Sequence, residues 1–106
     1  MPKYLFQATY TATGTKGLVS EGGTGRRNLI AHMCHELGGK LESFYYAFGE
    51  SDVYAVAELP DGITAASVTL AINQSGAVHV KTTVLLTPED VDMAAQRTTK
   101  YRAPGE

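Results

Sequence analysis

The centre of the chain reads Gly49-Glu50-Ser51-Asp52-Val53-Tyr54-Ala55-Val56-Ala57-Glu58-Leu59-Pro60-Asp61, which is a turn, a strand and the start of a helix. Apolar and polar residues alternate over Asp52–Leu59, and this alternation predicts a half-buried β-strand. Asp61 stands where its carboxylate can accept hydrogen bonds from the first N–H groups of a helix. Lys40–Phe48 has a strand pattern of its own, so the two strands are expected to form a β-hairpin.

The sequence on either side of this hairpin predicts two more strands and two helices. Lys3–Tyr10 and Ala77–Leu86 are rich in β-branched and aromatic residues, which favour strands. Arg26–Leu37 has a helical period and ends at a pair of glycines. A second helix starts after Asp61 and stops at Gly76. Its inner, sheet-facing stripe is predicted to consist of Ile63, Ala66, Leu70 and Ala71.

Thr87-Pro88-Glu89-Asp90 is a strong start signal for a third, short helix that runs to about Gln96. The element order is therefore β-α-β-β-α-β followed by a helix. This order is typical of the α+β class and of the ferredoxin-like split βαβ arrangement, with four antiparallel strands and two helices on one face. We expect a single domain over residues 1–96 and a C-terminal tail over residues 97–106.

The connection Thr11–Gly25 is polar and glycine-rich. At 15 residues it is at the upper end of the length of unstructured loops within domains. Three interpretations remain open for it: a mobile loop, a functional loop, or a partly helical segment.

Composition excludes several classes of partner and location. The net charge of −2 gives no electrostatic reason to expect nucleic acid or an anionic membrane as partner. The one cysteine, Cys34, cannot form an internal disulfide, and no apolar run is long enough for a membrane span. No signal peptide is apparent at the start, so the expected location is the cytoplasm.

A sheet with both helices on one side leaves its other face uncovered, and such a face usually marks an interface or a ligand site. We therefore expect self-association, as a homodimer or a higher homo-oligomer, with a dimeric α+β barrel as the natural form. A small molecule would bind in a cavity on this open face or between the sheet and the helices. Strand two contributes Phe44, Tyr46 and Phe48, or the alternate set, to the open face. The predicted ligand-binding residues are Gln7, Thr9, Tyr46, Tyr54, Glu58, His79 and Lys81.

Charged residues suggest further sites of lower specificity. Arg26 and Arg27 follow a glycine run at a predicted helix start and form a candidate anion site. His32 and His35 share a helix without a third ligand, so no metal site and no cofactor are expected. Glu58 on the open face would need a basic partner, for which Lys81 or His79 is the predicted choice.

Several segments, in order and at similar spacing, resemble the GYD domain family. They are Gly39–Tyr46, Gly49–Asp52, Glu58–Asp61, Asn73–Val78 and Lys81–Glu89. Within the family motif Gly49 and Asp52 are present, but Ser51 stands where the family usually has a tyrosine. A role of that tyrosine would be absent here or would pass to Tyr54, Tyr45 or Tyr46.

The resemblance implies a dimeric ferredoxin-like α+β barrel, an architecture that monooxygenases, decarboxylases, dismutases and ligand-binding regulators share. It therefore indicates architecture and not activity. The leading hypothesis is a small oligomeric protein that binds a small molecule on the open sheet face. The alternatives are a ligand-free oligomeric interaction or regulatory subunit, and a haem- or metal-dependent oxygenase that would use His79.

Overall fold

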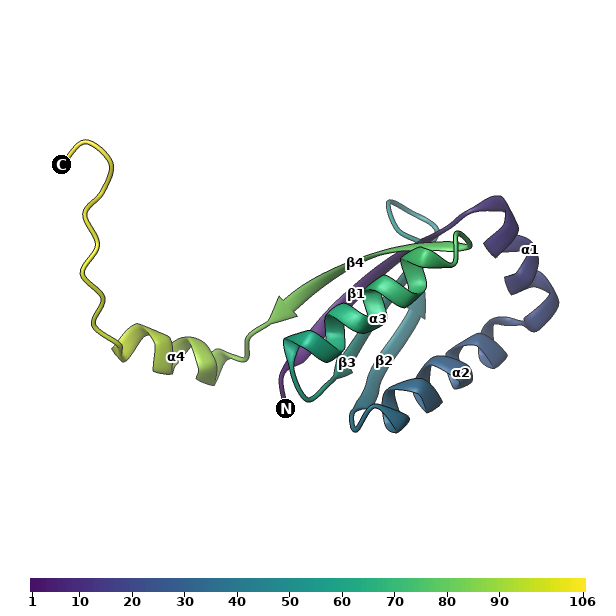
Figure 1. The fold of residues 1–106 in the computed structure, drawn as a ribbon, viewed down its shortest axis with the longest axis horizontal. Helices are drawn as coiled ribbons and strands as arrows, with labels where there is room; N and C mark the ends of the chain where they lie inside the picture. The colour runs from purple at the N-terminus through teal and green to yellow at the C-terminus, as the bar shows by residue number, and fades with distance from the viewer.

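The computed structural model describes residues 1–106 and contains a single four-stranded sheet with four helices (Figure 1). The elements in chain order are β1 (Lys3–Tyr10), α1 (Ala12–Glu21), α2 (Gly23–Glu36), β2 (Lys40–Tyr46), β3 (Val53–Glu58), α3 (Gly62–Gln74), β4 (Val78–Leu85) and α4 (Pro88–Gln96).

The sheet has the strand order β2-β3-β1-β4, and every neighbouring pair is antiparallel. Helices α2 and α3 lie on the same face of this sheet (Figure 1). The order and topology are consistent with an α+β ferredoxin-like fold, which confirms the predicted fold class. Both edges of the sheet, β2 and β4, remain without a strand neighbour.

The core lies between the sheet and these helices. Along β3, buried residues alternate with half-buried ones, so Val53, Ala55 and Ala57 face the helices. Tyr4 and Phe6 of β1 face the same way and are 3% and 9% exposed. This alternation confirms the predicted facing of β3.

The connection Thr11–Gly25 is mostly helical, so the third of its three interpretations is correct. The Thr11 side chain caps α1 by accepting a hydrogen bond from the Gly14 backbone N–H at 3.2 Å. The Thr11 backbone N–H in turn donates to the Ala77 carbonyl oxygen at 3.0 Å, which holds the start of α1 against the start of β4. Helix α2 accordingly begins at Gly23 and not at Arg26.

The predicted inner stripe of α3 is wrong. Ala65 and Val68 are buried, and Ile72 packs against the core. In contrast, Ile63 is 84% and Leu70 is 69% exposed on the outer side of the helix. Because α3 is apolar on both sides, its hydrophobic period does not identify the face that packs on the sheet.

The C-terminal helix α4 starts as predicted. Thr87 and Asp90 form a capping box in which each side chain accepts from the other's backbone N–H, both at 3.1 Å. The helix extends away from the sheet in line with β4, and the last ten residues continue beyond it (Figure 1). None of the helices has the length and apolar character needed to cross a membrane.

Candidate functional site

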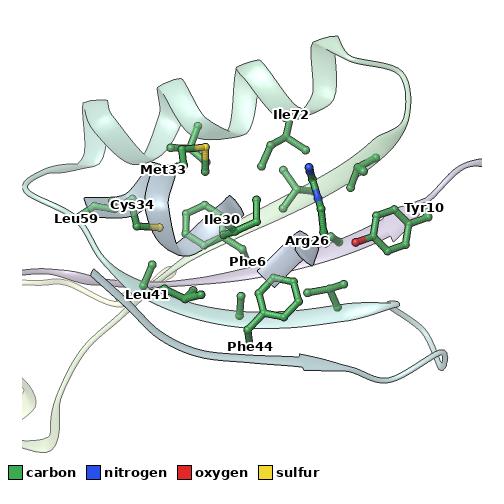
Figure 2. Close-up of a pocket in the computed structure, with 17 residues that line it drawn as sticks. Phe6, Tyr10, Arg26, Ile30, Met33, Cys34, Leu41, Phe44, Leu59 and Ile72 are labelled. Carbon is green, nitrogen blue, oxygen red and sulfur yellow. The ribbon is translucent and has the colours of Figure 1, made fainter. Parts of the chain in front are cut away.

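An apolar cavity of about 50 Å³ lies between the sheet and the helices α2 and α3 (Figure 2). Seventeen residues line it, and sixteen of them are hydrophobic. The exception is Arg26. The side chains around the cavity include Phe6, Tyr10, Ile30, Met33, Cys34, Leu41, Phe44, Leu59 and Ile72.

The cavity exists because α2 and α3 cover different parts of the sheet. Helix α3 packs over β4, whereas α2 packs over β2 at the opposite edge and against α1. The strands between them carry small residues on this face, among them Ala8, Ala55 and Ala57. These side chains leave space that neither helix fills.

Arg26 supplies the only charge in this lining. It belongs to the first turn of α2, and Figure 2 shows its side chain extending into the cavity at the end where Tyr10 lies. The ion pairs in the chain involve Lys3 and His32 as the bases, so Arg26 has no carboxylate partner. A half-buried guanidinium that forms no ion pair within the chain can pair with an anionic ligand.

Two phenol groups lie beside Arg26. The Tyr46 hydroxyl donates a hydrogen bond of 3.0 Å to the Gly23 carbonyl oxygen. Burial and the neighbouring Tyr10 raise the pKa of Tyr46 to about 12. Burial also raises the pKa of Tyr10, although the positive charge of Arg26 opposes this shift. Both phenols are therefore neutral at neutral pH.

Cys34 lines the opposite end of the cavity and is 3% exposed. Burial raises the pKa of its thiol, so the thiol stays protonated at neutral pH. This environment is that of a packing residue and not of a reactive nucleophile.

Six of the seven predicted ligand-binding residues lie on the open face of the sheet. Gln7 is directly opposite both Lys81 and Tyr54 in the strand register, and Thr9 is opposite His79. Glu58 is at the far end of β3, opposite Lys3. Gln7, Thr9, His79 and Lys81 line one polar recess of about 300 Å³, together with Glu50 and Ser51.

Tyr46 is on the other face, so its predicted place on the open face is wrong. A β-bulge in β2 causes this change, because the register shifts by one residue between Leu41 and Ser43. After the bulge, Phe44 and Tyr46 face the helices, and Tyr45 is 71% exposed. Of the two sets that the sequence left open for strand two, the alternate set occupies the open face.

Glu58 pairs with a different base from the two that were predicted. The Lys3 ammonium lies 2.6 Å from a Glu42 carboxylate oxygen and 3.4 Å from one of Glu58. The hydrogen bond from Lys3 to Glu42 is the main cause that raises the pKa of Lys3. The three side chains form a surface network at one end of the sheet, and Lys81 and His79 remain outside it.

The family-motif residues Gly49 and Asp52 lie in the turn between β2 and β3. The Asp52 carboxylate accepts a hydrogen bond from the Tyr10 backbone N–H at 2.8 Å, and the Asp52 N–H donates to the Ala8 carbonyl oxygen at 2.8 Å. Asp52 thus fastens the turn to the end of β1, which is a structural role. Ser51, which stands where the family usually has a tyrosine, is 9% exposed and lines the polar recess on the open face.

The remaining charged candidates do not converge. Arg27 does not line the apolar cavity, and it donates to the Asn28 side-chain oxygen at 3.1 and 3.3 Å. His32 lies 2.9 Å from Glu36 on the exposed surface of α2. No three His, Cys, Asp or Glu side chains are arranged to share a metal ion.

Sequence reasoning missed Tyr10, Glu50 and Ser51 as members of the two pockets. It also assigned Arg26 to a surface anion site and not to an apolar cavity. The available signal was the helical spacing of Arg26, Ile30, Met33 and Leu37, which places the arginine on the core-facing stripe of α2.

Comparison with known proteins agrees with the segments that suggested a family. The model of the GYD domain family matches residues 4–95, which include the helices α1 to α3 and all four strands except Lys3 of β1. A search of curated proteins and a search of solved structures found no match. The match extends over most of the sequence, and the chain therefore belongs to the GYD domain family.

Proposed function

We propose that this protein binds a small molecule with an apolar body and one anionic group, and that the ligand occupies the cavity between the sheet and the helices. The observation that carries this proposal is the unpaired, half-buried Arg26 at the end of a cavity whose other lining residues are apolar. Ligand sites are typically concave and apolar with a few polar groups that fix orientation.

The polar groups around Arg26 suit a carboxylate. The guanidinium offers a planar fork of N–H donors that fits two carboxylate oxygens. The Tyr10 and Tyr46 hydroxyls stay protonated because both pKa values are raised, so neither phenol adds a negative charge that would repel the ligand. Glu21 lies in the same outer region, lining a neighbouring groove with Arg26, and would disfavour a second anionic group.

The size of the cavity limits what enters without movement. A volume of about 50 Å³ exceeds what one water molecule needs, and is less than the ~150 Å³ of a cavity that holds benzene. Because α2 is attached mainly to β2 and α1, outward displacement of α2 would admit a larger body. Short aliphatic carboxylates are therefore the appropriate first probes.

The test is a titration of ¹⁵N-labelled protein with hexanoate, followed by the backbone amide chemical shifts. Shifts concentrated at Arg26, Ile30, Phe44 and Ile72 support the proposal. Shifts confined to the open face, at Gln7, Thr9 and His79, contradict it. Hexylamine, which has the same apolar body and the opposite charge, is the matched control and is expected to cause no saturable shifts.

The open-face recess is a second candidate site. It is favoured by the convergence of Gln7, Thr9, His79 and Lys81 with Glu50 and Ser51 around about 300 Å³. This lining has no apolar residue, so it suits a polar ligand that a second subunit would enclose. The titration above distinguishes this site from the apolar cavity.

We also propose that the protein forms a homodimer through the open face. Leu5, Val56 and Leu85 are apolar residues on this face that the single chain leaves half-buried. Native mass spectrometry is expected to give a dimer or larger assembly, and Val56→Asp is expected to reduce the size of that assembly by removing the open-face contact. Val19→Asp is the control, because Val19 is 80% exposed on α1, away from the sheet. A wild-type monomer at all concentrations would contradict the homodimer.

A ligand-free subunit remains the alternative if hexanoate and related carboxylates do not bind. No arrangement of residues favours the oxygenase hypothesis. His79 lies on the open face in a recess without apolar residues, which does not suit a haem, and no group of three His, Cys, Asp or Glu side chains is placed to hold a metal ion. The cytoplasmic location stays a prediction from the sequence.

A further inference from the structure

Helix α3 has no charged residue and is apolar on both sides. Ala65, Val68 and Ile72 face the core. On the outer side Ile63 is 84% and Leu70 is 69% exposed. Exposed aliphatic side chains that gather on one side of a helix form an apolar surface of the kind that usually marks an interaction site, so the outer side of α3 is expected to have a partner.

The edge strand β4 continues this apolar surface. The Asn73 side chain forms hydrogen bonds with the backbone of Val80, and the Thr69 hydroxyl forms one with the Thr82 hydroxyl. A step of four residues back along α3 therefore corresponds to a step of two residues forward along β4. The next step of this register brings Val84, which is 62% exposed, to the first turns of α3. We call the set Ile63, Ala66, Leu70 and Val84 the outer patch.

Helix α4 has an apolar side that its own domain does not cover. Its helical spacing places Val91, Ala94 and Ala95 on one side and Glu89, Asp92 and Gln96 on the other. Val91 is 53% exposed, and α4 has no buried residue. Only Leu86 and Thr87 separate α4 from β4, and Thr87 is extended, so the helix continues away from its own outer patch (Figure 1).

We propose that α4 of one copy packs its Val91 side on the outer patch of a second copy, and that the second copy returns the same contact. Both surfaces lie at the same end of the sheet, because β4 ends there beside the start of β1, and α3 begins just after β3 ends there. A single two-fold axis at this end therefore closes both contacts at once, which is how self-complementary interfaces form.

The area supports a reciprocal contact with a second copy. Ile63, Leu70, Val84, Leu86 and Val91 are each 53–84% exposed, and burying what remains of such a side chain removes roughly 40–80 Å². Ten such side chains in a reciprocal pair give roughly 400–800 Å², to which Ala66, Pro88, Ala94 and Ala95 of each copy add. This total approaches the ~1,000 Å² that specific interfaces need, whereas a single, unreturned contact would reach only half of it.

The test joins the two surfaces through introduced cysteines in separate chains. Unlabelled Leu70→Cys protein is mixed with ¹⁵N-labelled Val91→Cys protein, equilibrated, oxidised and weighed intact without reductant. The proposal gives a disulfide-linked species that contains one light and one heavy chain. Val19→Cys mixed with Val91→Cys is the control, because Val19 is 80% exposed, against 69% for Leu70, but lies on α1. Native Cys34 is buried and is present in both mixtures.

Two outcomes would overturn the proposal. Mixed dimers from Leu70→Cys and Val91→Cys that are no more abundant than in the control mixture would show that α4 does not reach the outer patch of another copy. A disulfide with the mass of one chain in the double variant Leu70→Cys/Val91→Cys, without the mixed dimer, would show that α4 folds back onto its own patch.

Discussion

The Tyr46 hydroxyl donates a hydrogen bond of 3.0 Å to the backbone carbonyl oxygen of Gly23, and this bond ties the edge strand β2 to the first turn of α2. Gly23 permits the contact because a side chain there would meet the Tyr46 ring at 3.1 Å. Arg26 follows in the same first turn, so the bond also fixes the part of α2 from which Arg26 enters the cavity.

Tyr46→Phe removes this hydrogen bond and keeps the ring. We expect the free energy of unfolding to fall by about 1 kcal/mol, the usual net value of one such bond. Urea unfolding at neutral pH measures it. Tyr45→Phe is the control, because Tyr45 is 71% exposed and its hydroxyl has no hydrogen-bond partner within the protein. An equal loss in both variants would show that the Tyr46 hydroxyl contributes nothing specific.

The raised pKa of Tyr46 makes stability depend on pH in the alkaline range. The pKa is about 12 in the folded protein against 10.0 for a free tyrosine, so between these values the folded state keeps a proton that the unfolded state has lost. The contribution of the protonated Tyr46 to the free energy of unfolding is therefore fully present below pH 10, and it is lost as the pH rises toward 12. Urea unfolding from pH 8 to 11.5 should show this fall in the wild type, and a smaller one in Tyr46→Phe. A fall of the same size in Tyr46→Phe would assign the dependence to other groups.

Two glycines of α1 are expected to respond in opposite directions to alanine. A side chain at Gly14 would lie 2.0 Å from the Ala77 carbonyl oxygen, so Gly14→Ala must displace α1 from β4 and should cost about 1–3 kcal/mol. Gly17 has nothing within 4 Å, and Gly17→Ala should stabilise the helix by about 0.5–1 kcal/mol. Thermal unfolding of the two variants compares them directly. Stabilisation by both would mean that α1 does not pack closely on Ala77.

Helix α1 was one of three interpretations of its segment because the local sequence gives only weak signals for a helix. Helix propensity over Ala12–Glu21 is low, and the helix buries no residue that would give a hydrophobic period. The Thr11 cap and the close approach of Gly14 to Ala77 favour the helix, and the second is a tertiary contact that local sequence does not reveal. By contrast, β1, β3, β4 and α4 follow from alternation and from a capping box, which are local signals.

The candidate site was only partly predictable for similar reasons. The open-face residues of β1, β3 and β4 follow from simple alternation, and their convergence follows from the strand order. Tyr46 was misplaced because the bulge in β2 has no sequence signal comparable to a turn or a cap. The cavity beside Arg26 depends on a separation between α2 and α3 that only the packed structure defines.

The outer side of α3 shows the limit of pattern reasoning most clearly. Ile63, Ala66 and Leu70 have the spacing of a buried stripe, and so do Ala65, Val68 and Ile72 on the opposite side. A sequence with two apolar stripes does not indicate which one packs on the sheet. The presence of both is informative about assembly, because the exposed aliphatic side chains of the outer stripe form an apolar surface that a partner would cover.

Affinity should increase with the length of the aliphatic carboxylate if the apolar body enters the cavity. Each added methylene contributes about 0.8 kcal/mol on burial, which is about fourfold in the dissociation constant. Isothermal titration calorimetry of butanoate, pentanoate and hexanoate measures the increment. Affinities that do not change along the series would place the carboxylates on a surface charge and outside the cavity.

The measurement that tests the central claim most directly is the affinity of hexanoate for the wild type, Arg26→Met and Arg27→Met, by isothermal titration calorimetry under identical salt. Both variants lose one positive charge from adjacent positions, but only Arg26 lines the cavity, whereas Arg27 bonds Asn28. A hydrogen bond to a charged group is worth about 1.5–3 kcal/mol, so Arg26→Met should weaken binding roughly 10- to 100-fold. Arg27→Met should bind hexanoate as the wild type does, and equal affinity in all three proteins would contradict the account.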